Sequence, residues 1–261
     1  MKKEIQIFFS AVMFFTRIPV PTIKNYSTEQ LQKSARYFSW VGLLVGLIGA
    51  SVFYISQKYF SASLAIAFSM LATILTTGAF HEDGFADCCD AFGGGWNKEK
   101  ILTIMKDSRL GTYGVIGLIG ILGFKFLLLH EMLIYISVKQ MLLVMIAAHS
   151  CSRLMPVIVM QLLVYVQDID VSKSKPLANR KLTILEMIIA IIGGLICFLF
   201  LPLYFLFILI PILLSTFLMA NYFKKWIGGY TGDCLGTTQQ ISELIFYFGV
   251  ILISILVKNI V

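Results

Sequence analysis

Long apolar runs dominate this 261-residue chain and leave few folds open to it. Hydrophobic residues make up 58% of the sequence and charged residues only 13%. A soluble domain holds about 45–50% apolar and about 25% charged residues, so this composition lies well outside the soluble range. We therefore expect an all-α, polytopic transmembrane helical bundle of about seven spans.

The spans are placed by length, because about 20 helical residues cross a hydrocarbon core of roughly 30 Å. One run, residues 184–220, would reach about 55 Å as a single helix, nearly two bilayers, so a break is expected at Leu201-Pro202-Leu203. The predicted spans are residues 37–56, 63–80, 114–134, 140–166, 184–201, 203–220 and 241–257.

The N-terminal stretch begins like a signal peptide, with two lysines ahead of the apolar run Ile5–Phe15. Glu4 and Arg17 interrupt that pattern, and no small-residue cleavage site follows. We expect an interfacial or re-entrant helix that ends at Pro19 and Pro21, with an amphipathic face against the lipid. No internal repeat or low-complexity linker divides the chain, which predicts one integral membrane domain over residues 1–261.

The basic residues predict the orientation of this domain. The first 36 residues and the loops 81–113, 167–183 and 221–240 carry most of the Lys and Arg residues outside the spans. The exceptions are Lys58, Lys139 and Lys258. The positive-inside rule then places the basic loops in the cytoplasm. We expect the membrane to be the cytoplasmic (inner) membrane of a prokaryotic cell. We attribute the net charge of +7 to this topology and to attraction of phosphorylated substrates and anionic lipid, and expect no nucleic-acid partner.

Four acids gather in His81-Glu82-Asp83-Gly84-Phe85-Ala86-Asp87-Cys88-Cys89-Asp90, at the predicted cytoplasmic edge. Asp83, Asp87 and Asp90 are spaced i, i+4 and i+7, which on a helix confines them to a face roughly 60° wide. Neighbouring carboxylates repel one another unless they take up protons or a cation joins them. Hard oxygen donors suit Mg²⁺ or Mn²⁺, and Mg²⁺ is usually held together with substrate phosphates. The cluster predicts a metal site for chemistry on a phosphate ester.

Two glycine-rich stretches lie on the same predicted side. In the first, residues 106–114, backbone N–H groups beside glycine could neutralise a diphosphate together with Arg109. In the second, residues 228–236, Asp233 could complete the metal site, while Glu243 enters the last span nearby. Either stretch alone also fits a plain connection before a helix. We expect catalytic loops at about 81–113 and 221–240.

Charged residues inside the predicted spans add a third group of candidates. Lys125 lies about 16 Å into its span, and Arg153 is similarly internal, one turn after His149. Such residues are costly in lipid and face a cavity or a partner. One interpretation is the floor of a polar cavity that opens to the cytoplasm. The other is ion pairing that holds the bundle together, which we favour for His149.

Taken in order, these motifs resemble the cobalamin synthase family over nearly the whole chain. The acidic motif followed by Lys106-Asp107-Ser108-Arg109 is the most specific part of the resemblance. Two departures stand out: Ser39-Trp40 where the family often has Phe-Pro, and Glu82 where it usually has an apolar residue. The landmarks are Phe15–Pro21, Gly42–Gly46, Gly78–Asp87 with Asp90, Met105–Thr112, Lys125 with Glu131, Ser152-Arg153, and Thr231–Asp233 with Glu243.

The resemblance implies an adenosylcobinamide-GDP ribazoletransferase of vitamin B12 synthesis. A hydroxyl of alpha-ribazole, or of its 5′-phosphate, attacks the cobinamide-side phosphorus of adenosylcobinamide-GDP and expels GMP. The implied metal ligands for Mg²⁺, with Mn²⁺ as the alternative, are Asp83, Asp87, Asp90 and Asp233. The implied catalytic residues add Lys106, Asp107 and Arg109, and the implied substrate contacts are Arg17, Lys125, Arg153, Thr231, Asp233 and Glu243. Whether protomers associate with one another or with other cobalamin-assembly enzymes stays open.

Three other activities fit the sequence less well. A CDP-alcohol phosphatidyltransferase would have Arg after Ala86, where this chain has Asp87, and a second pair of aspartates four apart. A prenyltransferase would show two similar acidic motifs, and the loop with Asp233 is a poor copy of the first. A transporter for a divalent cation or an organic anion would place its binding groups near the midplane of repeated halves, and only Lys125 and Arg153 suit that pattern.

Overall fold

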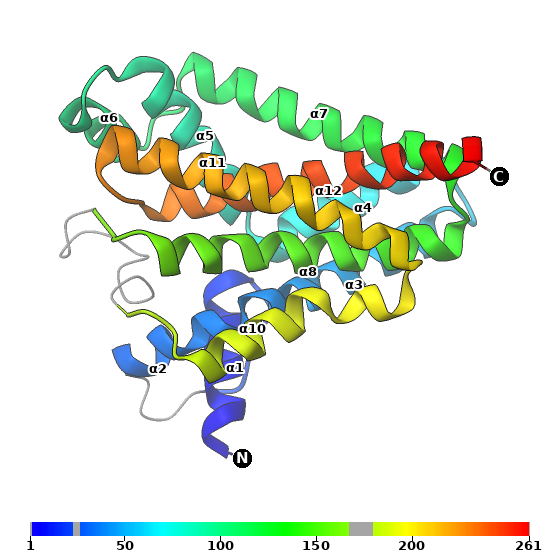
Figure 1. The fold of residues 1–261 in the computed structure, drawn as a ribbon, viewed down its shortest axis with the longest axis horizontal. Coiled ribbons are helices and arrows are strands. Elements are labelled where there is room, and N and C mark those ends of the chain that lie inside the picture. The colour runs from blue at the N-terminus through cyan, green and yellow to red at the C-terminus, as the bar shows by residue number, and fades with distance from the viewer. Residues whose placement is uncertain (1, 23–26, 167–179, 261) are drawn as a thin grey trace.

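A computed structural model describes residues 2–22, 27–166 and 180–260, and these residues form a helical bundle without a β-strand (Figure 1). The all-α prediction is therefore confirmed. Within these ranges, five helical segments are each long and apolar enough to cross a membrane, as expected for a multi-pass membrane protein. These segments are Glu29–Ser56, Thr112–Tyr135, Val138–Leu162, Leu203–Ile227 and Gly232–Asn259.

The described residues form helical elements joined by turns and irregular segments. In chain order they are α1 (Lys2–Phe15), α2 (Thr28–Ser34), the 3-10 helix η1 (Ala35–Tyr37), α3 (Phe38–Ser56), α4 (Ala62–Thr77), α5 (Phe80–Gly94), α6 (Lys98–Met105), α7 (Thr112–Tyr135), α8 (Val138–Leu162), α10 (Ile184–Leu195), the 3-10 helices η2 (Ile196–Phe200) and η3 (Leu203–Ile208), α11 (Leu209–Ile227) and α12 (Gly232–Ile260).

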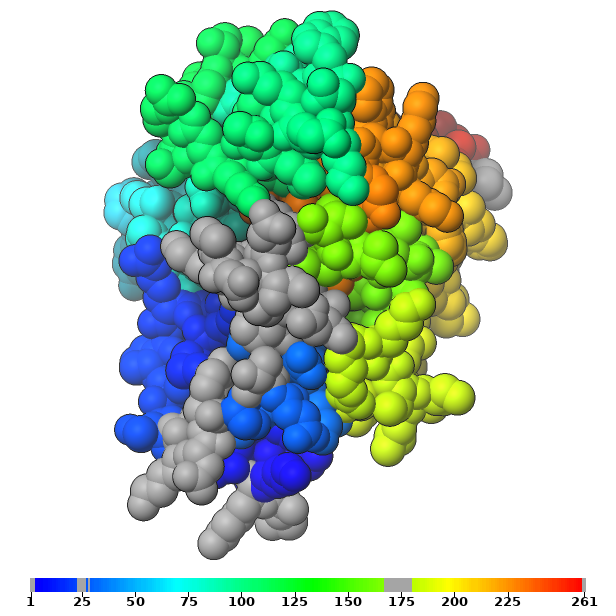
Figure 2. Space-filling model, turned by 90° about the vertical axis from the view of Figure 1, so that its left-hand side faces the viewer, coloured from blue at the N-terminus to red at the C-terminus, as the bar shows by residue number. Residues whose placement is uncertain are grey.

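The long helices run side by side, and the polar elements gather at one end of the bundle (Figure 1). That end, on the left of Figure 1, holds α5, α6 and the start of α12, while the C-terminus lies at the other end. Helix α1 lies across the bundle direction near the same polar end. Figure 2 looks onto this end, with residues around α6 above and the N-terminal elements below. We call it the polar end.

Helix α8 lies at the centre of the bundle, and 78% of its most apolar window is buried. Its closest neighbour is α3, where Gly42 and Gly46 leave no room for a side chain. A Cβ at Gly42 would lie 2.4 Å from the carbonyl oxygen of His149, and one at Gly46 would lie 2.8 Å from Cα of Ile146. Small residues let helix backbones approach closely in a membrane, so this motif positions α3 against α8.

The predicted count of seven spans is not confirmed. Among the described residues, five segments are long and apolar enough to cross a membrane, and the number is six if the bent α4–α5 pair forms one span. The run 63–80 contains the 16-residue α4, which is followed by an 88° bend into α5. The run 184–201 forms the short α10 and then the 3-10 helix η2. The expected break at Leu201-Pro202-Leu203 is confirmed, since η2 ends at Phe200 and η3 begins at Leu203.

Both stretches predicted as catalytic loops contain much helix. Residues 81–113 hold most of α5 and all of α6, and in residues 221–240 only 228–231 lie between α11 and α12. Gly228, with φ of 82°, ends α11 in the left-handed conformation that glycine adopts without strain. The expected N-terminal helix is present as α1 and ends at Phe15, before Pro19. Most of the basic loop 167–183 lies outside the described residues.

Candidate active site

Helix α5 carries the acidic motif across the polar end of the bundle. Gly78 and Ala79 precede it with φ values of 67° and 58°, and these two left-handed residues produce the bend from α4. The helix predicted from the aspartate spacing is present over Phe80–Gly94. On it Asp83 is exposed, whereas Asp87 and Asp90 are half-buried.

The start of α12 packs directly on α5 and brings Asp233 to the same place. A Cβ on Gly84 would lie 2.9 Å from Cα of Asp233, so this crossing requires glycine. The Thr237 hydroxyl donates a hydrogen bond of 3.3 Å to the Gly84 carbonyl oxygen across the same contact. Asp233 consequently lies within electrostatic reach of Asp83 and Asp87. Two segments some 150 residues apart in sequence thus bring three carboxylates together.

Asp90 has a different environment from the other aspartates. Its two carboxylate oxygens accept hydrogen bonds of 2.7 Å from the backbone N–H of Gly111 and 2.8 Å from that of Gly114, at the start of α7. A Cβ at Gly111 would lie 2.5 Å from Asp90 Oδ1, so the glycine makes room for the carboxylate. The N–H groups expected to bind a diphosphate are therefore occupied by Asp90.

The donor chemistry and the partners of the carboxylates decide whether they could hold a metal ion. Among the described residues, no group of three or more His, Cys, Asp or Glu side chains is arranged to hold an ion. The carboxylates of Asp83 and Asp87 nevertheless have no hydrogen-bond or ion-pair partner within those residues, and Asp233 lies near them. Mg²⁺ takes hard oxygen donors, often one or two carboxylates completed by water and substrate phosphates. Asp83, Asp87 and Asp233 fit Mg²⁺ in donor type, whereas Asp90 is already bound to backbone.

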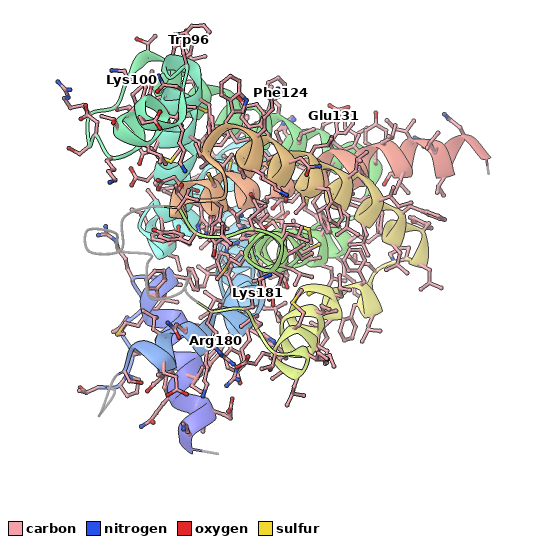
Figure 3. All side chains as sticks on the ribbon, turned by 60° about the vertical axis from the view of Figure 1, so that its left-hand side comes forward. Trp96, Lys100, Phe124, Glu131, Arg180 and Lys181 are labelled. Atoms are coloured by element: carbon pink, nitrogen blue, oxygen red, sulfur yellow. The ribbon has the colours of Figure 1, made fainter. Side chains whose placement is uncertain are left out.

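The connection from α6 to α7 holds the predicted basic residues at the surface. Lys106 and Arg109 are exposed, with 87% of the Arg109 side chain accessible. Arg109 donates to Asp107 from its backbone N–H at 3.1 Å and from Nη2 at 2.6 Å. These bonds lower the pKa of Asp107 to about 2. Asp107 and Arg109 thus form an exposed ion pair near the end of α5. Trp96 and Lys100 mark the same end of the molecule in Figure 3.

The charged residues inside the spans pair with one another. Lys125 Nζ lies 2.5 Å from Glu243 Oε1, and both side chains are buried. Tyr247 donates to the same oxygen at 3.1 Å, and Gln239 donates to Glu243 Oε2 at 2.8 Å. Structural pairing, one of the two interpretations of these residues, is the one that the geometry supports. Contact of Lys125 or Glu243 with substrate stays a prediction.

Arg153 and His149 belong to the same buried cluster. Arg153 Nη1 donates to the His149 carbonyl oxygen at 2.9 Å, and His149 Nε2 lies 3.5 Å from Glu243 Oε1. Arg153 Nε has no hydrogen-bond partner among the described residues. Gln240 joins the cluster to the acidic motif, because its Nε2 donates to Glu82 Oε1 at 3.0 Å. The unusual Glu82 therefore points into the protein rather than toward Asp83.

Arg17 and Thr231 take two further positions. Arg17 is exposed and its guanidinium lies against Gly78, where an added Cβ would be 2.2 Å from Nε. Its backbone N–H donates to the Thr76 carbonyl oxygen at 2.7 Å, so it lies beside the bend that begins α5. Thr231 is fully buried, and its Oγ1 accepts a 3.3 Å hydrogen bond from the Cys234 N–H. That contact caps α12 immediately before Asp233.

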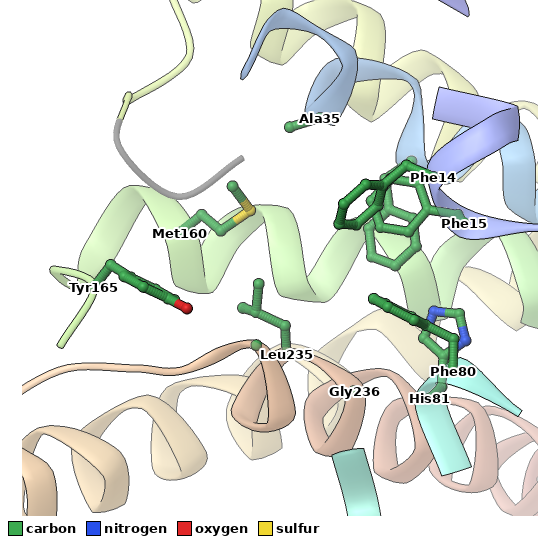
Figure 4. Close-up of a pocket in the computed structure, with 11 residues that line it drawn as sticks. Phe14, Phe15, Ala35, Phe80, His81, Met160, Tyr165, Leu235 and Gly236 are labelled. Atoms are coloured by element: carbon green, nitrogen blue, oxygen red, sulfur yellow. The ribbon is translucent and has the colours of Figure 1, made fainter. Parts of the chain in front are cut away.

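An aromatic cavity beside the acids was not anticipated from the sequence (Figure 4). It lies among α1, α3, α5, α8 and α12, and its lining includes Phe14, Phe15, Phe38, Phe80 and His81. Sequence patterns place these residues on apolar helix faces, where they look like ordinary core. Only the non-local packing of α1 against α3 and α5 reveals the cavity. The one signal of this cavity in the sequence was the position of His81 beside aromatic residues such as Phe80.

The chain is similar along nearly its whole length to one family model and to relatives that share one name. A family model described as cobalamin-5-phosphate synthase matches residues 7–251. Relatives named adenosylcobinamide-GDP ribazoletransferase from Shewanella frigidimarina and Shewanella amazonensis are 44% and 43% identical, over 97% of this chain and 97% of each relative. A relative of the same name from Shewanella oneidensis is 44% identical over 97% of this chain and 96% of its own length. No solved structure matches the chain.

Proposed function

The chain belongs to the cobalamin-5-phosphate synthase family, and we propose that it carries out its reaction at the polar end, between α5 and the start of α12. It is a transferase of cobalamin biosynthesis that joins ribazole to adenosylcobinamide-GDP. The comparisons give no support to a phosphatidyltransferase, a prenyltransferase or a transporter. The observation that carries the site is that Asp83 and Asp87 of α5 lie within electrostatic reach of Asp233 at the start of α12.

In the proposed reaction, a ribazole hydroxyl oxygen forms a bond to the cobinamide-side phosphorus while the bond from that phosphorus to the bridging oxygen breaks. The electron pair leaves with GMP, and the hydroxyl proton passes to a base. Asp83, Asp87 and Asp233 would hold Mg²⁺, which when bound neutralises the diphosphate and favours departure of GMP. Asp83 is the exposed member of the three, so it is placed to meet the substrate first.

The Asp107–Arg109 pair supplies an exchangeable cation for the same substrate. The Arg109 guanidinium is exposed and can turn from Asp107 to a phosphate, because diphosphate oxygens offer the same bidentate geometry as a carboxylate. While Arg109 stays paired, the low pKa of Asp107 makes that carboxylate a weak base. Release of Arg109 to the substrate raises the proton affinity of Asp107, which suits it to accept the hydroxyl proton. Lys106 adds a second exposed positive charge.

Arg17 is a further candidate for a phosphate contact, because it is exposed beside the bend before α5. The buried Lys125, Arg153 and Glu243 would reach substrate only if their cluster opened. Thr231 contributes by capping α12 ahead of Asp233. We place this end of the bundle on the cytoplasmic side of a bacterial inner membrane because of its basic residues. The substrate nucleotides are found on that side.

The test is turnover by the purified protein in detergent, where no compartments exist. With adenosylcobinamide-GDP, ribazole and Mg²⁺ present, we expect release of GMP in equal amount to the new corrinoid product. The Asp83→Asn protein, purified in the same way, is the control for a contaminating activity. GMP release without ribazole, or no release at all, would contradict the proposed reaction.

A further inference from the structure

One wall of the aromatic cavity is a stack of flat rings. Phe15 stacks on Phe38 with ring centroids 4.1 Å apart and planes at 18°, and Phe38 stacks in turn on His81 at 5.6 Å and 9°. Met160, Tyr165 and Leu235 line the cavity away from these rings (Figure 4). The space between these side chains is about 480 Å³ when the solvent at its open mouth is included.

One polar atom in this lining lacks a partner. His81 is 99% buried, since its relative exposure is 1%, and its Nε2 has no hydrogen bond within the described residues. A buried ring nitrogen without a partner is unfavourable, and a ligand that hydrogen-bonds to it would recover that cost. The cavity is therefore apolar on its faces and offers one unsatisfied hydrogen-bonding group.

The cavity also adjoins the proposed reaction site through two of its own lining segments. His81 lies two residues before Asp83 on α5, and Gly232 immediately precedes Asp233 on α12. The two segments touch, because a Cβ on Gly236 would lie 3.1 Å from the His81 carbonyl oxygen. A ring bound in the cavity would have its substituent directed at the junction of α5 and α12, beside the carboxylates.

We propose that this aromatic cavity binds the planar benzimidazole base of ribazole, between the Phe15–Phe38–His81 stack and the side chains of Met160 and Leu235. The inference rests on the proposed function, because ribazole is a riboside whose base is a flat, largely apolar heterocycle with one free ring nitrogen. His81 Nε2 forms the hydrogen bond to that nitrogen. Base stacking on aromatic side chains supplies the rest of the affinity, and the ribose hydroxyl reaches the carboxylates.

The test separates the two substrates by their KM values. In His81→Phe the ring remains but the nitrogen is lost, and we expect the KM for ribazole to rise about fivefold to tenfold, the usual effect of one hydrogen bond. Leu235→Trp fills part of the aromatic cavity and should raise the KM for ribazole further. Neither change should move the KM for adenosylcobinamide-GDP. Leu252→Trp, on the exposed part of the same helix, is the matched control and should leave both KM values unchanged.

A rise in the KM for adenosylcobinamide-GDP, or an unchanged KM for ribazole in both pocket variants, would overturn the proposal while leaving the transferase assignment intact. Absence of GMP release from the wild-type protein would instead contradict the proposed function. A second measurement needs no variant: an azido-benzimidazole riboside is cross-linked to wild-type protein in detergent. Labelling of peptides from α1 and α12 that ribazole suppresses supports the site. Labelling elsewhere, or labelling that only added phospholipid suppresses, refutes it.

Discussion

The environment of Asp90 leads to a prediction that distinguishes a positioning role from metal binding. Both of its oxygens accept backbone N–H groups at the start of α7, from Gly111 at 2.7 Å and Gly114 at 2.8 Å. The connection that carries Lys106, Asp107 and Arg109 lies between α6 and this helix terminus. We expect Asp90→Asn to loosen that connection, because an amide offers one acceptor oxygen where the carboxylate offers two.

The magnitude follows from the bonds that are lost. A hydrogen bond to a charged group contributes about 1.5–3 kcal/mol. Asp90 is half-buried, which favours the lower part of that range, so loss of one bond and of the charge at the helix start should cost about 2 kcal/mol. If this energy holds the α6–α7 connection in place, its opening becomes about 30-fold more frequent, since 1.4 kcal/mol is a factor of ten.

Hydrogen exchange of residues 106–114 measures this opening, and a Mg²⁺ titration of GMP release measures metal affinity. Asp90→Asn should speed the exchange about 30-fold and leave the Mg²⁺ concentration for half-maximal activity within a factor of two. Asp87→Asn is the matched control, with the opposite expectation for both measurements. A tenfold shift in the Mg²⁺ requirement of Asp90→Asn, with unchanged exchange, would show that Asp90 binds the metal and refute the reasoning.

Three further outcomes are expected. Asp83→Asn should remain in the membrane but lose at least about 1,000-fold in the rate of GMP release, equivalent to several kcal/mol, and a near-normal rate would remove Asp83 from the site. Glu243→Gln leaves Lys125 buried without its counter-ion and should lower the free energy of unfolding in detergent by about 3–5 kcal/mol. The double variant Glu243→Gln and Lys125→Met should recover this stability. An unchanged melting temperature of the single variant would mean that the pair contributes nothing. A maleimide probe should label Lys98→Cys in inverted membrane vesicles and not in intact cells, whereas labelling of intact cells would reverse the proposed orientation.

The features that could be predicted from the sequence depend on local spacing. The i, i+4, i+7 pattern of Asp83, Asp87 and Asp90 correctly indicated a helix, and the length of the run 184–220 correctly indicated a break at Pro202. Both follow from the rise and periodicity of a helix, which need no knowledge of the rest of the molecule.

The features that were missed depend on contacts between distant segments. Asp90 and its backbone donors are 21 and 24 residues apart, and no periodicity predicts that this carboxylate accepts hydrogen bonds from the start of α7. The bend at Ala79 was equally hidden, because alanine rarely adopts a positive φ and is there held by the packing of α5 across the polar end. Pairing of Lys125 with Glu243 was one of two interpretations, and only the packing of α7 against α12 decides between them.

The shortness of α4 has a consequence for the surrounding lipid. Its 16 residues extend only about 24 Å, several ångströms less than a typical hydrocarbon core of about 30 Å. The bilayer beside α4 must thin locally, or α5 must sink below the headgroups, and each adjustment costs energy for every ångström of mismatch. If α4 and α5 form one broken span, acyl-chain length would set how deeply the carboxylates on α5 lie and would couple them through one helix to the thickness of the membrane.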